Sequence, residues 1–363
     1  MLTLRLIQRE ARIAWPVAAV LALLAVLLTA VPLSWPPRFD RLAAGTLADR
    51  VDRAVEAGPL LSAGAVTTPE PWLPKPAPGT LDRDLDRIGD GVRAAVGPRL
   101  AAELGTPWAR VATGLAGVHG PGVATFYGGD PPKVNLVHAQ HDGPDGPVEY
   151  LQGRAPRQPA ADLLPGLPDE EPPTIEVAAS ETTRERFHLT VGERYELTGY
   201  KWDAEVVLVG VFRTDQGAQR LWRRSPFLVQ PSPVLVAADN GTKWEMDGQL
   251  LTSAGGIELV ARNETGLDVT WELPVAADRS GPGATPAGLA EARDALTAWR
   301  ATPRDQLCAA GSHEPCAVAG QEVRGLTVAD RLTPELDAFA AQRLRTEQLQ
   351  GFALAGLLSI VVA

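Results

Sequence analysis

The sequence is short of cysteines, of basic runs and of aromatic side chains. Two cysteines in 363 residues exclude a framework of several disulfides and a zinc site with four cysteine ligands. The formal net charge is −10, and nucleic-acid binding requires clustered basic residues, so we expect no nucleic-acid partner. Hydrophobic residues make up 45% and aromatic residues 6% of the chain, which excludes a disordered acidic polymer. The chain is therefore expected to fold around a sizeable core.

The chain also lacks the short motifs of known catalytic chemistry. No phosphate-binding GxxxxGK[ST] loop occurs, since the Gly-Thr-Lys at 241–243 lacks the glycine frame, and no GxSxG turn is present. His138 and His141 form an H-x-x-H pair beside Asp142. The strand-and-turn pattern around this pair favours a solvated loop over a metal site. We expect a protein that is not an enzyme and holds no cofactor or metal of its own.

Proline and glycine are abundant, with 32 and 35 residues respectively. This content predicts many short elements joined by loops. The hydrophobic pattern predicts an α+β fold, with helices towards the ends of the chain and a strand-rich centre. The expected helices are 39–57, 81–104, 181–187 and 286–299, and the expected strands are 110–118, 123–127, 133–138, 148–151, 175–180, 195–198, 204–212, 222–236 and 256–274.

A long apolar segment lies near the N-terminus. Residues 13–33 carry no charge, and a helix of this length spans about 30 Å, the thickness of a bilayer core. The basic head at 1–12 predicts a cytoplasmic N-terminus. We therefore expect a transmembrane helix, with a cleaved signal peptide and a buried core helix as alternatives. The residues expected at the membrane interfaces are Arg5, Arg9, Arg12, Trp15 and Trp35.

A second apolar segment, 351–363, lies at the other end. It is too short to cross a membrane alone, so we expect 346–363 to be the start of a second transmembrane helix that continues beyond the sequence given. A buried C-terminal helix is the alternative. Residues 331–345 are expected to form a stalk helix that leads into it, with Thr327 or Thr333 as its N-cap.

The body between these ends, 34–330, is then expected outside the cytoplasm. Cys308 and Cys316 lie close in sequence, and an oxidising compartment favours a disulfide between them over two free thiols. The body is expected to have two lobes with a boundary near 215–240, so that 240–330 forms the second lobe.

Residues 153–212 carry a recognisable pattern. A GR-x-P is followed by a Glu before a short strand, a Ser/Thr-rich helix start, a VG turn and a valine-rich strand. This pattern resembles the extracytoplasmic segment of FtsX-like/MacB-like ABC transporter permeases, whose core is expected around 150–215. The residues that carry the resemblance are Gly153, Arg154, Pro156, Glu176, Ser180, Val191, Gly192 and Gly210.

The resemblance implies a function. The layout of a basic head, one membrane span, a large outer domain and a second span is also that of this family. It implies a permease subunit in the cell membrane, paired as a homodimer or pseudo-dimer. It further implies a separate cytoplasmic ABC ATPase that binds the ATP, and a role in export or mechanotransmission. The alternative is a single-span, membrane-anchored extracellular binding protein without a motor.

Overall fold

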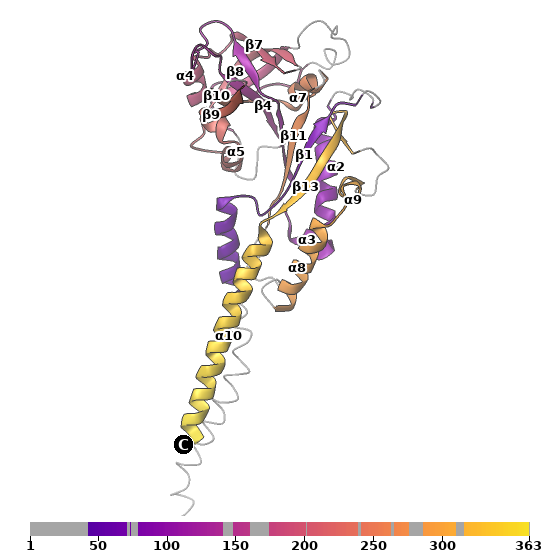
Figure 1. The fold of residues 1–363 in the computed structure, drawn as a ribbon, viewed down its shortest axis with the longest axis vertical. Coiled ribbons are helices and arrows are strands. Elements are labelled where there is room, and N and C mark those ends of the chain that lie inside the picture. The colour runs from indigo at the N-terminus through magenta and orange to yellow at the C-terminus, as the bar shows by residue number, and fades with distance from the viewer. Residues whose placement is uncertain are drawn as a thin grey trace, which may run out of the picture. The chain divides into compact units, whose positions relative to one another are not determined.

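The computed structural model describes part of the chain, drawn in colour in Figure 1. The described residues are 43–70, 73, 79–140, 148–159, 174–200, 202–238, 241–262, 265–275, 286–309 and 316–362. Outside them lie the basic head 1–12, the predicted transmembrane helix 13–33, and the expected interface residues Arg5, Arg9, Arg12, Trp15 and Trp35. Contacts divide the chain into a smaller unit, Met1–Arg53, Ala277–Ala292 and Pro334–Ala363, and a larger unit, Ala54–Ala276 and Arg293–Thr333.

The larger unit is α+β and contains a 13-stranded sheet, which confirms the predicted strand-rich centre. Its strands are β1 (Leu61–Thr68), β2 (Trp108–Thr113), β3 (Ala116–His119), β4 (Lys133–Ala139), β5 (Tyr150–Gly153), β6 (Thr174–Ser180), β7 (Arg194–Gly199), β8 (Asp203–Phe212), β9 (Ser232–Ala238), β10 (Gly241–Thr252), β11 (Leu267–Leu273), β12 (Ala317–Val318) and β13 (Gln321–Asp330). Its helices are α2 (Leu81–Ala94), α3 (Pro98–Glu103), α4 (Glu181–Phe187), α5 (Gln219–Arg224), α6 (Pro226–Val229), α7 (Ala254–Ala261) and α9 (Arg304–Ala309), while α8 (Pro286–Arg300) and α10 (Leu332–Val362) include residues of both units.

Part of the sheet closes on itself as a barrel. The strands pair in the order β4, β3, β7, β8, β6 and β10, and β10 returns to β4 through a parallel pairing. Along β7 and most of β8, alternate residues are buried, as the period of a strand requires. The valine-rich strand β8, for example, buries Val206 and Leu208 and leaves Val207 and Val209 half-buried.

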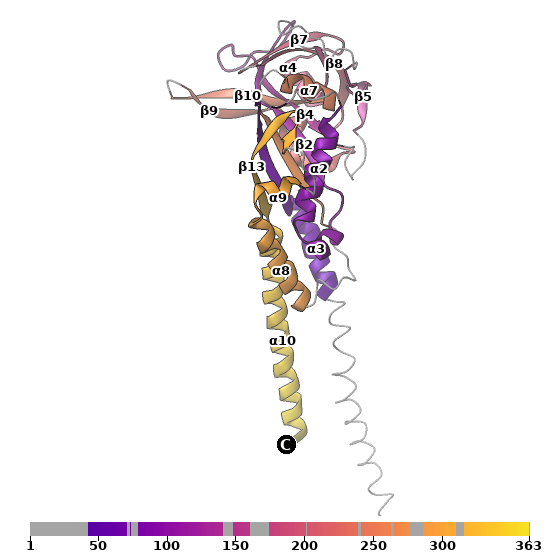
Figure 2. The same cartoon turned by 90° about the vertical axis from the view of Figure 1, so that its right-hand side faces the viewer.

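Five further strands extend from the barrel as an antiparallel sheet in the order β2, β11, β1, β13 and β12, while β5 pairs with β8 and β9 pairs with β10. Helix α2 lies against this sheet in both views (Figures 1 and 2). It buries a stripe at helical spacing that includes Leu81, Leu85 and Ile88. The indole of Trp271 in β11 donates a hydrogen bond to the Leu85 carbonyl at 2.9 Å, so the buried polar group is satisfied.

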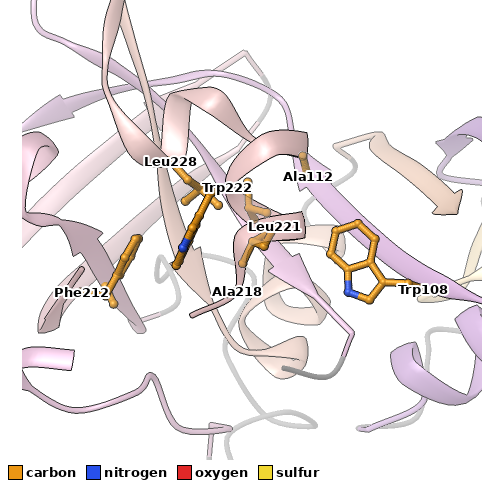
Figure 3. Packing of buried hydrophobic residues seen from close by; sticks show 9 residues of the cluster. Trp108, Ala112, Phe212, Ala218, Leu221, Trp222 and Leu228 are labelled. Atoms are coloured by element: carbon orange, nitrogen blue, oxygen red, sulfur yellow. The ribbon is translucent and has the colours of Figure 1, made fainter. Parts of the chain in front are cut away.

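A hydrophobic cluster joins α5 and α6 to the sheet (Figure 3). The rings of Phe212 and Trp222 stack with centroids 5.1 Å apart, and Leu221 and Leu228 are buried beside them. The predicted strand 222–236 is therefore wrong in its first part, which forms α5 and α6. Pro226 begins α6, and a proline in the first helical turn loses no hydrogen bond.

Three other predicted elements differ from the structure. The expected strand 256–274 consists of α7 followed by β11, because every residue of α7 is buried and the sequence shows no one-sided helical pattern. The expected strand 110–118 is interrupted by a turn between β2 and β3. The expected strand 123–127 does not form; the glycines on either side of it, Gly122, Gly128 and Gly129, adopt positive φ and belong to turns.

The expected helix 81–104 is divided into α2 and α3 at Gly97, which has a φ of +96°. Residues 240–330 do not form a sheet of their own. Strand β10 pairs with β4 and β6, whereas β11 and β13 pair with β1, so this segment contributes to the same sheet as 150–215. The predicted division into two lobes near 215–240 is therefore not seen in the pairing of the described strands.

Candidate functional site

The smaller unit brings two helices side by side (Figure 1). The guanidinium of Arg50, in the helical segment 43–57, donates to the Glu335 carboxylate of α10 at 2.7 Å and to the side-chain Oε1 of Gln342 at 3.4 Å. In α10, Phe339 is 3% exposed. The segment that follows the N-terminal apolar residues is thus paired with the helix that leads into the C-terminal apolar residues.

Helix α10 runs without interruption from Leu332 to Val362 and includes most of the predicted stalk, 331–345. Its N-cap is Asp330, whose carboxylate accepts from the backbone N–H groups of Leu332 and Thr333 at 2.9 Å each. The prediction of Thr327 or Thr333 as the cap was wrong. Among the helices within the described residues, none combines the length and the apolar character needed to cross a membrane.

Four residues of the sequence motif lie at the end of β5 and in β6: Gly153 ends β5, Arg154 and Pro156 follow it, and Glu176 lies in β6. The guanidinium of Arg154 donates to both oxygens of the Glu176 carboxylate, and the backbone N–H of Arg157 donates to the same carboxylate at 2.8 Å. These hydrogen bonds lower the pKa of Glu176, with Arg154 as the main cause. Pro156 lies between the two arginines. The motif therefore fastens the chain after β5 to strand β6.

The other motif residues fix turns and caps. The Ser180 hydroxyl accepts from the Thr183 N–H at 3.1 Å and caps α4. Val191 and Gly192 form the predicted turn, where Gly192 has a φ of +92° and donates to the Leu208 carbonyl at 2.7 Å. These positions hold the backbone geometry of the α4 cap and of the turn between α4 and β7.

We expect the Arg154–Glu176 pair to make the stability of the folded protein decrease at acidic pH. The pKa of Glu176 in the folded protein lies below its ordinary value of 4.5. The ion pair therefore contributes fully to the free energy of unfolding above about pH 4.5, and this contribution is lost as the pH falls through the lowered pKa. Between pH 6 and pH 3 the urea midpoint of the wild type should fall further than that of Glu176→Gln. Equal falls in the two proteins would show that the pair does not stabilise the fold.

Cys308 and Cys316 are joined by a disulfide, with Cα atoms 5.3 Å apart. Cys308 is buried in α9, and Cys316 precedes β12. The bond thus holds α9 next to the start of β12 in the larger unit. Both residues have structural positions, and the disulfide fits the compartment that the sequence predicts.

Removing this disulfide should destabilise the larger unit. Closing so short a loop is worth about 2.5 kcal/mol in the unfolded chain, so the Cys308→Ser, Cys316→Ser double variant should lose that amount. The free energy of unfolding, measured with urea for the wild type with and without reductant, provides the check. The reduced wild type should match the double variant, and an oxidised wild type that is no more stable than the variant would contradict the expectation.

His138 does not belong to a metal site in the described residues. Its Nε2 lies 2.9 Å from Asp82 Oδ1 in the first turn of α2, which gives the ring a structural partner. His141 and Asp142 lie outside the described residues. Within the described part of the chain, no group of three or more potential ligand side chains could hold a metal ion.

The larger unit also contains a cleft of about 650 Å³. Five connecting segments converge on it: the end of β1, the β2–β3 turn, the β7–β8 turn, the connection from α7 to β11, and the β12–β13 turn. The aromatic side chains of Tyr200 and Trp202 line the cleft. The position of this cleft is not predictable from the sequence, because its walls come from turns that are far apart along the chain.

Comparisons with known proteins give one similarity to report. No family model matches the chain, and no curated protein sequence matches it. Among solved structures, it is similar to the periplasmic region of MacB from Actinobacillus actinomycetemcomitans, at 8% sequence identity and a TM-score of 0.28. The match covers 76% of this chain and 92% of that chain. A TM-score of this size does not establish a shared fold.

Proposed function

We propose that this chain is a permease subunit, or the N-terminal portion of one, of an ABC transporter of the FtsX/MacB type. In this proposal, 13–33 crosses the membrane, 346–363 begins a second crossing, and the body between them lies outside the cytoplasm. A cytoplasmic ABC ATPase binds and hydrolyses the ATP. The permease works as a dimer or pseudo-dimer in the cell membrane.

The pairing of the helical segment 43–57 with α10 carries this proposal. Both helices lead towards the apolar ends, and the Arg50–Glu335 ion pair joins them at 2.7 Å. The motif at 153–212 supports the same family, because Arg154 ties the chain after β5 to β6 and a side chain at Gly153 or Gly210 would clash with backbone atoms. Two helices joined in this way can move as one element when their membrane ends are displaced.

The mechanism follows from the continuity of α10. Closure of the ATPase on ATP draws the inner ends of the membrane helices together. Since α10 has no break between Leu332 and Val362, a shift at its apolar end is transmitted along the helix to β13. The outer domain then moves as a rigid body, which either expels a substrate or activates an outer partner.

A distance measurement tests this coupling. Spin labels at Ala329→Cys, an exposed position in β13, report the separation of the two subunits of the dimer by pulsed EPR. The native cysteines are joined in a disulfide and remain unlabelled. In the complete complex, ATP with vanadate should shift the distance distribution relative to the nucleotide-free state. An unchanged distribution in a complex that hydrolyses ATP would contradict the mechanism.

A further inference from the structure

The cleft of the larger unit has a fixed floor. The Gln321 side chain, 2% exposed, donates from Nε2 to the carbonyl groups of Ala261 and Thr265 at 2.7 Å each. Its Oε1 accepts from the Thr67 hydroxyl, which in turn accepts from the Leu267 N–H at 2.9 Å. This network ties β1, α7, β11 and β13 together at one place. Because these hydrogen bonds already fix the residues at the base of the cleft, little conformational entropy is lost there when a ligand binds.

The charged side chains of the cleft are already partnered. The Glu70 carboxylate is paired with the Arg324 guanidinium at its rim, and Arg262 is also engaged in an interaction. Among the described residues that line the cleft, these are the charged ones. An ionic ligand would therefore lose its hydration without meeting an uncompensated opposite charge. The cleft favours an uncharged ligand.

The walls and mouth of the cleft are largely apolar. Trp202 is 4% exposed and forms part of the wall, and its backbone carbonyl accepts from the Gly199 N–H at 2.8 Å. At the mouth, Leu115 is 37% exposed and Tyr200 is 86% exposed. A cavity of this size with apolar walls is typical of small-molecule sites, and exposed apolar side chains at its mouth gain free energy when a ligand covers them.

We propose that this cleft binds an uncharged, mostly apolar small molecule. The apolar body of the ligand lies against Leu115, Tyr200 and Trp202. Its hydrogen-bonding groups meet the hydroxyl groups of Thr68 and Thr265, which also line the cleft. The site lies wholly within the larger unit, so the proposal does not rest on the permease function.

Gly114 provides a variant that fills the cleft. A Cβ at this position would lie 3.7 Å from Thr265 Oγ1 and 3.9 Å from Trp202 Nε1, which are ordinary contact distances. Gly114→Leu therefore places a side chain between these two walls without a backbone clash. Gly64→Leu is the matched control, because its Cβ is 4.0 Å from the nearest atom and it lies outside the cleft.

The probe is the uncharged fluorophore N-phenyl-1-naphthylamine, titrated into the full chain in lipid nanodiscs with empty nanodiscs as the background. We expect saturable binding to the wild type, affinity at least about tenfold lower for Gly114→Leu, and affinity within about twofold for Gly64→Leu. The anionic analogue 8-anilino-1-naphthalenesulfonate should bind at least about tenfold more weakly than the neutral probe.

Several results would overturn the proposal. They are the absence of saturable binding above the nanodisc background, an unchanged affinity in Gly114→Leu, or equal affinities for the neutral and anionic probes. If Gly114→Leu does not fold, Tyr200→Ser provides a second test, because the highly exposed Tyr200 side chain contributes little to the core. It should weaken probe binding by about fivefold, and an unchanged affinity would count against the site.

Discussion

Replacing Leu344 with proline should abolish the coupling between the outer domain and ATP hydrolysis. A proline at this position removes the hydrogen bond to the Ala340 carbonyl and clashes with that turn, at a cost of about 3 kcal/mol to an intact helix. Leu344 is 60% exposed, so little packing is lost with its side chain. The nucleotide-dependent change in the distance between the labels at Ala329→Cys in the two subunits should disappear, and transport-linked activity should disappear with it.

The control for this variant is Leu344→Ala, which shortens the same side chain and keeps the helix. It should behave as the wild type in both measurements. The thermal unfolding of the larger unit should be the same in Leu344→Pro, Leu344→Ala and wild type. If Leu344→Pro retains full ATPase-linked function, α10 does not transmit the movement.

A side chain at Gly210 should disrupt the packing of β5 on the barrel strand β8. A Cβ built on this glycine would lie 2.2 Å from the Arg154 carbonyl oxygen and 2.9 Å from the Tyr150 ring, so β5 and β8 cannot keep their spacing. Gly210→Val is therefore expected to destabilise the larger unit by about 3 kcal/mol or more. The urea midpoint of the full chain, followed by tryptophan fluorescence, measures the loss.

Gly64→Val serves as the control for crowding at a strand glycine. Its Cβ would meet the Val269 carbonyl oxygen at 4.0 Å, so the change should be below about 1 kcal/mol. A Gly210→Val protein as stable as Gly64→Val would show that β5 does not pack tightly on β8. The motif glycine would then have no steric role.

The segment from β6 to β8 could be predicted because its signals are local. Ser180 is a favourable N-cap, Gly192 permits the turn, and the β-branched run at 206–211 suits a buried strand. All three have these roles in the structure. The residues of the predicted motif likewise lie together, since Arg154 pairs with Glu176.

Other elements gave misleading local signals. In β10, the polar residues Glu245, Asp247 and Gln249 alternate with Met246 and Leu250, and both sets are buried, so the strand has no simple polar face. Helix α7 is buried on all sides and therefore reads as a strand. Burial set by the tertiary fold overrides the local pattern in both cases.

Features made by distant segments could not be predicted at all. Barrel closure depends on the parallel pairing of β10 with β4, and a single sequence gives no signal for such a contact. The cleft is assembled from five separate connections. The pairing of Arg50 with Glu335 joins residues from opposite ends of the chain.

Purification of the endogenous protein from native membranes, through a tag at its N-terminus, tests the central claim most directly. The measurement gives the mass of the tagged chain and the identity of the proteins that co-purify with it. The permease proposal predicts a chain well above 38.5 kDa in association with a P-loop ATPase. A chain of about 38.5 kDa with no ATPase would contradict it and favour a membrane-anchored binding protein.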